Sequence, residues 1–209
     1  MEEDKEAVVT KAVKKKLIVL DKINRGHGAG GAGTNANGLP YETVTDLRSH
    51  WKEEVNSVGP YTYVTFIEDL NNVIYIYSSK SKFPKMMQAN GHLDATVSMG
   101  HGGKWPDECY LDLKNSTVFI IEKKFQLKSG SVCEKIQTAP FKLHNYKRLF
   151  PKLKVVYMYC LSDWFKTNCV AELEYLALHD IPVFWGRDFD YKEKVIRFIT
   201  QTSLNHAKT

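Results

Sequence analysis

Apolar and β-branched residues fill most of positions 117–125, where the chain reads TVFIIEKKF, and the run ends in charged side chains. A short run of this composition is typical of a buried strand. Because successive side chains of a strand point to opposite faces, Glu122 and Lys124 share one face and Lys123 points to the other. The run therefore predicts a strand of a central sheet with a carboxylate and an ammonium group side by side near its end.

The order of the other runs predicts an α/β or α+β domain with a mixed central β-sheet flanked by helices. Further strands are expected at 61–67, 73–77, 108–113, 154–160 and 182–185. Helices are expected at 3–24, from about 39 to 55, and at 132–149, 163–178 and 190–201. The first two strands are joined by Asp69-Leu70-Asn71-Asn72, which predicts a hairpin. No internal repeat or linker divides the chain, so one domain over 1–209 is expected.

Two segments read as loops. Six glycines at 26–38 disfavour helix and strand, and 79–106 is polar and irregular. A loop as long as the second is usually functional. Gly26, Gly28 and Gly31 match the spacing of a dinucleotide fingerprint, but more glycines follow where a helix should open, so a dinucleotide site is not expected.

Charge and cysteine content narrow the class of protein further. The net charge is +5, which permits a nucleic-acid partner without requiring one. No apolar run approaches the roughly 18–20 residues of a membrane span, and the start is acidic, so a cytoplasmic protein without a signal peptide is expected. The four cysteines form no C-x-x-C pair, which argues against structural zinc and favours reduced thiols. They are Cys109, Cys133, Cys160 and Cys169.

Asp107 follows Pro106 at the start of the strand that should pair with 117–125, so its carboxylate can lie beside Glu122. Two carboxylates suit a hard cation such as Mg²⁺, which lowers the pKa of a bound water. A nearby lysine can orient that water and stabilise charge that develops on a phosphate. The set Asp107, Glu122 and Lys124 therefore indicates metal-dependent phosphodiester hydrolysis.

These three residues resemble the PD-(D/E)xK motif of the restriction-endonuclease-like nucleases. The stretches 121–126 and 129–138 are similar to the active-site strand and following helix of type II restriction endonucleases, and 30–42 to their N-terminal segment. The resemblance implies a restriction-endonuclease-like core and Mg²⁺-dependent, sequence-specific cleavage of double-stranded DNA that leaves 5′-phosphate ends. It implies Asp107 and Glu122 as metal ligands, Lys124 as the catalytic lysine and Glu42 as an accessory catalytic carboxylate.

The resemblance also makes duplex DNA the expected partner. Donors near the active strand could hold phosphates, and the 79–106 loop could read bases. The candidate contacts are Lys128, Ser129, Ser131, Lys135, Lys104, Gln88, Asn90, His92, His101 and Asn35. His92 and His101 could instead ligate zinc in a ββα-metal nuclease, although the cysteine pairs or His-Asn spacing that would support this are missing.

A palindromic DNA target would favour a two-fold homodimer, with the N-terminal helix in 1–25 as a candidate contact. A prokaryotic or viral host cell is the expected setting. Two alternatives stay open: a structure-selective repair or recombination nuclease of the same fold, and a DNA-binding module that does not cut.

Overall fold

The computed structural model describes residues 32–55, 62–94, 105–128 and 132–206. The chain forms two compact units, residues 1–45 and 46–209. In the first unit the described element is helix α2 (Ala32–Val44), which contains Pro40. The Thr45 hydroxyl donates to the carbonyl oxygen of Tyr41 at 2.7 Å, one turn back, where this helix ends.

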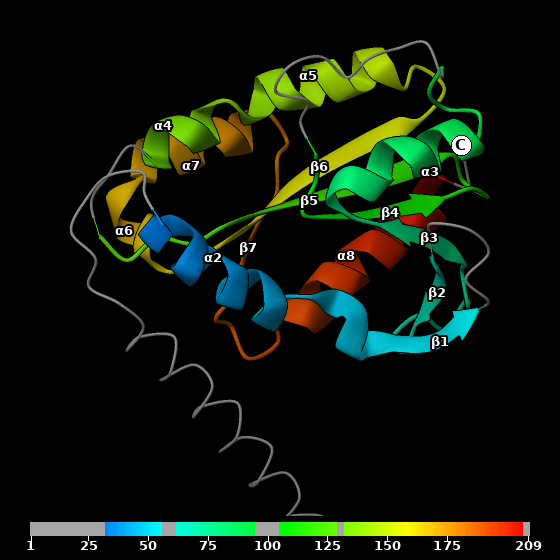
Figure 1. Cartoon of the computed structure of the whole chain (residues 1–209), viewed down its shortest axis with the longest axis horizontal. Helices are drawn as coiled ribbons and strands as arrows, with labels where there is room; N and C mark the ends of the chain where they lie inside the picture. The colour runs from blue at the N-terminus through cyan, green and yellow to red at the C-terminus, as the bar shows by residue number, and fades with distance from the viewer. Residues whose placement is uncertain (1–31, 56–61, 95–104, 129–131, 207–209) are drawn as a thin grey trace, which may run out of the picture. The chain divides into compact units, whose positions relative to one another are not determined.

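The second unit is an α/β structure built on a curled, mixed, seven-stranded sheet (Figure 1). Its strands lie in chain order: β1 (Trp51–Val55), β2 (Thr62–Phe66), β3 (Tyr75–Ser78), β4 (Glu108–Asp112), β5 (Thr117–Lys124), β6 (Lys154–Leu161) and β7 (Val183–Trp185). Strands β1 to β5 pair antiparallel, whereas β5, β6 and β7 pair parallel. Strand β5 is therefore the boundary between a meander and a parallel layer.

Helix η1 (Leu47–His50) precedes β1, and η2 (Lys80–Lys82) and α3 (Phe83–Ala89) lie between the antiparallel strands β3 and β4. Parallel neighbours need a crossover. Helices α4 (Val132–Gln137) and α5 (Ala139–Leu149) form the crossover from β5 to β6, and α6 (Trp164–Asn168) and α7 (Val170–Leu178) form the crossover from β6 to β7. Helix α8 (Tyr191–His206) follows β7. Figure 1 shows α8 on one side of the sheet and α5 on the other. Both sheet faces are thus covered.

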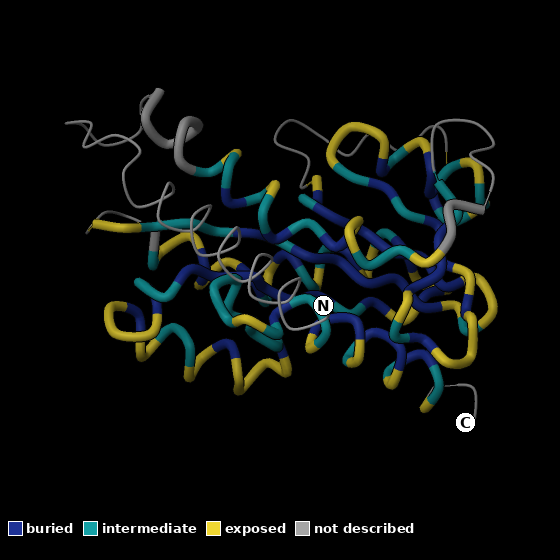
Figure 2. Tube along the Cα trace, turned by 90° about the horizontal axis from the view of Figure 1, so that it is seen from below, coloured by how far each residue is buried: buried dark blue, intermediate teal, exposed yellow. Residues whose placement is uncertain are grey.

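Apolar side chains fill both faces, and the buried part of the trace runs through the strands (Figure 2). One face packs Ile120 and Tyr157 against α3, α4, α5, α6 and α7. The other face is aromatic: Phe66, Tyr75, Tyr110 and Phe119 have ring centroids 5.1–6.4 Å apart. Helix α8 joins this second face through a 3.3 Å hydrogen bond between the hydroxyls of Tyr75 and Ser203.

The mixed sheet flanked by helices confirms the coarse prediction. The hairpin at Asp69–Asn72 is also confirmed, and it is built as expected: the Asp69 carboxylate accepts hydrogen bonds from the backbone N–H groups of Asn71 and Val73. The helix expected at 3–24 lies outside the described residues. Thr138 and Cys169 divide the helices expected at 132–149 and 163–178 into α4–α5 and α6–α7.

Three predictions were wrong. The helix expected up to residue 55 ends at Val44, and 51–55 forms β1 because it pairs with β2. Residues 32–38, expected in a glycine-rich loop, belong to α2. The 79–106 segment is not wholly a loop, since η2 and α3 lie within it. Phe83, Met86 and Met87 recur at helical spacing and are fully buried. This spacing could have predicted α3, but the residues on either side are polar and the segment was therefore predicted to be a loop.

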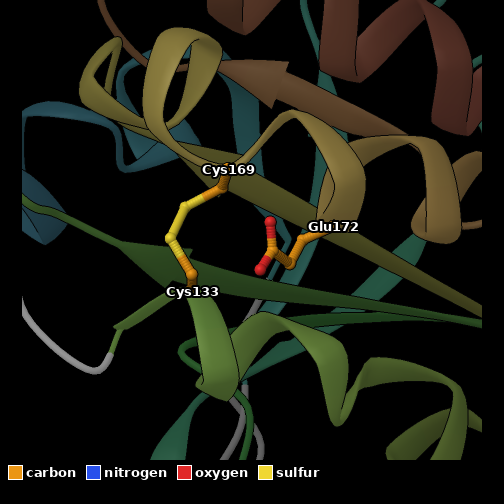
Figure 3. Close-up of side chains that lie close together, drawn as sticks. All are labelled: Cys133, Cys169 and Glu172. Carbon is orange, nitrogen blue, oxygen red and sulfur yellow. A yellow bond between two sulfur atoms is a disulfide. The ribbon is translucent and has the colours of Figure 1, made fainter.

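The expectation of four reduced thiols was also wrong. Cys133 of α4 and Cys169, between α6 and α7, form a disulfide with Cα atoms 5.8 Å apart (Figure 3). Cys109 and Cys160 are buried and are not part of this disulfide. The two cysteines are 36 residues apart in the sequence, and only the folding of the two crossover connections brings them together. The disulfide could therefore not be predicted from a local pattern. The disulfide therefore joins the connection after β5 to the connection after β6.

Reducing this disulfide should lower the free energy of unfolding by about 4 kcal/mol, because a 36-residue loop is freed in the unfolded chain. Urea unfolding of the whole protein with and without reductant measures the difference. Cys133→Ser is the matched control and should show no dependence on reductant. Equal midpoints for the wild-type protein in both conditions would contradict the stabilising role.

Candidate active site

Asp107 and Glu122 are brought together by the β4–β5 hairpin. Glu108 pairs with Ile121 in this antiparallel ladder, so Asp107, one residue earlier, meets the position of Glu122. The Asp107 Oδ2 atom accepts a 2.7 Å hydrogen bond from the backbone N–H of Lys123. That bond holds the Asp107 carboxylate against the backbone of β5 at Lys123, the residue next to Glu122 in the chain.

The Glu122 carboxylate forms ion pairs with two lysines. Its Oε1 atom lies 2.7 Å from Nζ of Lys124 and 2.9 Å from Nζ of Lys142. Only 12% of the Glu122 side chain is exposed. Burial raises the pKa of Glu122, but the ammonium groups of Lys124 and Lys142 outweigh burial and hold the pKa below its ordinary value. Glu122 is therefore charged at neutral pH and is neutralised by two lysines.

The alternation of β5 separates its two lysines, as the sequence predicted. Lys124 contacts Glu122, whereas Nζ of Lys123 forms an ion pair with Oε1 of Glu108 on the opposite face of the sheet. Both side chains of that second pair are almost fully buried. Lys124 is thus the strand lysine that shares a face with the carboxylates, and its catalytic role stays a prediction.

Lys142 is the site residue that sequence reasoning missed as a member of this cluster. It is 8% exposed and reaches Glu122 from α5. Its neighbours at helical spacing, Ala139 and Tyr146, are buried as well. The sequence could have indicated this contact, because a lysine in the buried stripe of an amphipathic helix needs a carboxylate partner for its ammonium group.

Buried tyrosines lie next to the Glu122 carboxylate. The rings of Tyr146 and Tyr157 are 6.1 Å apart, and those of Tyr157 and Tyr159 are 5.5 Å apart. Burial raises the pKa of all three phenols, and the charge of Glu122 raises it further. The phenols therefore stay neutral, and an apolar surround of this kind strengthens the ion pairs of Glu122.

The donor set fits a hard divalent cation. Asp107 and Glu122 supply carboxylate oxygens, the ligands that Mg²⁺ prefers. Lys124 and Lys142 now neutralise Glu122, so a metal ion would compete with them for the same oxygen. Glu42, the expected accessory carboxylate, lies in α2 of the other compact unit, and its role stays a prediction.

Two other groups of potential metal ligands occur in the described part of the chain. Cys133, Cys169 and Glu172 form one, but its sulfur atoms are bonded to each other (Figure 3). In the other, His50 uses its two ring nitrogens on different carboxylates, Nδ1 on Glu68 and Nε2 on Glu193. The imidazole thereby links the turn after β2 to α8, and one ligand atom of each of the three residues lies within 4.8 Å of the others.

The expected DNA contacts are spread over several elements. Lys128 and Lys135 are exposed near the end of β5 and on α4. Asn90 caps α3 by donating its side-chain amide to the Met86 carbonyl oxygen at 2.8 Å, which gives it a structural task. Gln88 is half-buried in α3. Asn35 lies in α2.

Several of the other expected contacts cannot be placed. Ser129, Ser131, Lys104 and His101 lie outside the described residues. His92 lines a groove with Arg148 and Lys152, and burial together with the charge of Lys152 lowers its pKa. Because its proposed zinc partner His101 is not described, the zinc alternative stays a prediction.

Comparisons with protein-family profiles, with curated proteins and with solved structures found no match. The resemblance to the PD-(D/E)xK nucleases therefore depends on the motif residues and on their arrangement. Within the described ranges, no helix has the length and apolar character needed to cross a membrane.

The lowered pKa of Glu122 makes a prediction about stability. A carboxyl group whose pKa is lower in the folded state contributes stability above its unfolded pKa, and this contribution disappears as the pH falls through the folded value. Glu122→Gln should therefore lower the free energy of unfolding at pH 7 by roughly 2 kcal/mol, with a difference that shrinks below about pH 4. Urea unfolding across pH measures it.

Glu174→Gln is the matched control, because Glu174 is an exposed carboxylate on α7. It should leave the unfolding free energy unchanged at every pH. A Glu122→Gln protein as stable as the wild type at pH 7 would contradict the ion pairs described for this site.

Proposed function

We propose that this chain is a Mg²⁺-dependent type II restriction endonuclease with a restriction-endonuclease-like core. The observation that carries the proposal is the placement of Asp107, Glu122 and Lys124 on one side of the β4–β5 hairpin. The meander that leads into a parallel layer through a helical crossover agrees with the topology that the resemblance implies.

In the proposed reaction, Asp107 and Glu122 hold the metal, which when bound supplies Lewis-acid activation of water and phosphate. Lys124 orients the attacking water and stabilises the negative charge that develops on the phosphate. The new P–O bond forms opposite the P–O3′ bond that breaks. The products are a 5′-phosphate and a 3′-hydroxyl, and Glu42 is the proposed accessory carboxylate.

Lys142 would change partner during this cycle. Its ammonium group is held by Glu122 in the metal-free protein. If Glu122 held a metal ion, the Lys142 ammonium group would be placed to contact the phosphate from the α5 side. The exposed Lys128 and Lys135 would add phosphate contacts near the same strand.

The proposed partner is double-stranded DNA with a palindromic site, recognised by a homodimer, because protein symmetry mirrors site symmetry. The proposed location is the cytoplasm of a prokaryotic or virus-infected cell.

Incubation with unmethylated plasmid and phage DNA and Mg²⁺ tests the activity, followed by sequencing of the ends. Discrete fragments that share one end sequence support a restriction endonuclease. Cleavage confined to branched, nicked or mismatched DNA would favour the repair nuclease. Binding without cleavage in either Mg²⁺ or Mn²⁺ would favour the non-catalytic module and overturn the enzyme.

Asp107→Ala and Glu122→Ala should each lower the cleavage rate by about 100-fold or more, as expected when a metal ligand is lost. The measurement is the rate of plasmid cleavage, with DNA binding in Ca²⁺ recorded alongside. Glu174→Ala is the matched control, because it removes an exposed carboxylate on α7. Normal cleavage by both alanine variants would show that the site is wrong.

Lys142→Met should tighten Mg²⁺ binding several-fold, because one of the two ammonium groups that compete for Glu122 is removed. Titration calorimetry with Mg²⁺ on the DNA-free protein measures the effect. Lys147→Met, an exposed position on the same helix, should leave the affinity unchanged. Weaker Mg²⁺ binding by Lys142→Met would contradict the competition.

A further inference from the structure

A pocket of about 370 Å³ opens at the β7 edge of the sheet, between β7, the turn that follows it and α8. Four of its lining residues are aromatic: Phe184, Trp185, Tyr191 and Phe198. The rings of Phe184 and Phe198 meet edge to face, with centroids 5.6 Å apart. A concave site of this size and character is typical of small-ligand pockets.

The charges around the pocket are arranged unevenly. Lys194 is neutralised by Asp188 at 3.0 Å and by Asp190 at 2.9 Å. Lys166 lies 4.8 Å from the centre of the Trp185 ring and also forms an ion pair with Asp163. Arg197, by contrast, is exposed, and no carboxylate among the described residues pairs with its guanidinium group. One cation of the pocket is thus available to an anionic ligand.

The register places Trp185, which lines this pocket, at the same end of the sheet as Lys124. In the parallel layer Lys124 is paired with Leu161, and Leu161 with Trp185. Trp185 is therefore two strands from Lys124, roughly 10 Å at the usual strand spacing. Both residues end their strands, and the carboxyl ends of parallel strands are where α/β sheets bind ligands.

We propose that this pocket binds one nucleotide, with the base against the aromatic side chains and the phosphate on Arg197. Aromatic side chains stack any base, and a guanidinium group pairs well with phosphate. Asp188 and Gln201, which also line the pocket, can hydrogen-bond to the polar edge of a base. The nucleotide comes either free from solution or as an unpaired residue of a DNA strand. The proposal concerns binding and does not depend on cleavage.

The test is quenching of tryptophan fluorescence in the full-length protein, without Mg²⁺ so that no DNA is cut. The probes are thymidine 5′-monophosphate, a short oligothymidylate, a duplex of the same length and inorganic phosphate. Thymidine monophosphate or the oligothymidylate should quench, and Arg197→Ala should weaken that binding by at least fivefold. Arg148→Ala, an exposed arginine in the groove with His92, is the matched control and should bind normally.

Trp185→Phe should keep the binding, measured by calorimetry, and lose most of the quenching, which would locate the ligand. Quenching by the monophosphate indicates a free-nucleotide site, and quenching by the oligothymidylate alone indicates a strand contact; both support the proposal. Three results would overturn the proposal. They are equal binding of inorganic phosphate and the monophosphate, equal binding by Arg197→Ala and the wild type, and no binding of either nucleotide probe. Asp107→Ala should bind the nucleotide probes as the wild type does. A failure of the nuclease proposal can therefore be distinguished from a failure of the nucleotide-binding proposal.

Discussion

The ion pair between Glu108 and Lys123 is the constraint on which the arrangement of the site depends. It joins β4 to β5 on the face opposite the candidate active site, and both side chains are 2% exposed. A slip of one residue in this hairpin would move Lys123 to the other face and Glu122 away from Asp107. Burial raises the pKa of Glu108, against the opposing effect of Lys123, and the Tyr110 hydroxyl donates to the same carboxylate at 3.2 Å. A buried pair of this kind is better suited to specify a register than to add net stability.

The site combines residues from two kinds of connection. Asp107, Glu122 and Lys124 come from one hairpin, while Lys142 arrives from the helix of the crossover to β6. Two ammonium groups on one carboxylate leave the metal-free site electrically satisfied and partly buried. A cation can enter only by replacing contacts that already exist, so metal binding and lysine release are linked events.

The sequence predicted the elements with strong local patterns. The apolar run at 117–125 and the turn at Asp69 were placed correctly, and the alternation along β5 separated Lys124 from Lys123. The failures came where tertiary pairing decided the outcome. Residues 51–55 form a strand only because β2 is beside them, and the Cys133–Cys169 bond depends on two crossovers that no local pattern records. The Lys142 contact was hidden in the same way, since a helix shows its buried stripe but not its partner.

The change from antiparallel to parallel pairing at β5 implies an order of folding. The β4–β5 hairpin pairs strands that are joined directly by the turn at 113–116, whereas β6 reaches β5 only across the whole α4–α5 crossover. Non-local pairing is slower because loop closure precedes the contact. The two carboxylates therefore meet early, in a hairpin that carries uncompensated negative charge, and Lys142 joins them late. During synthesis the charge balance of the site is completed only after α5 has left the ribosome and docked on the sheet.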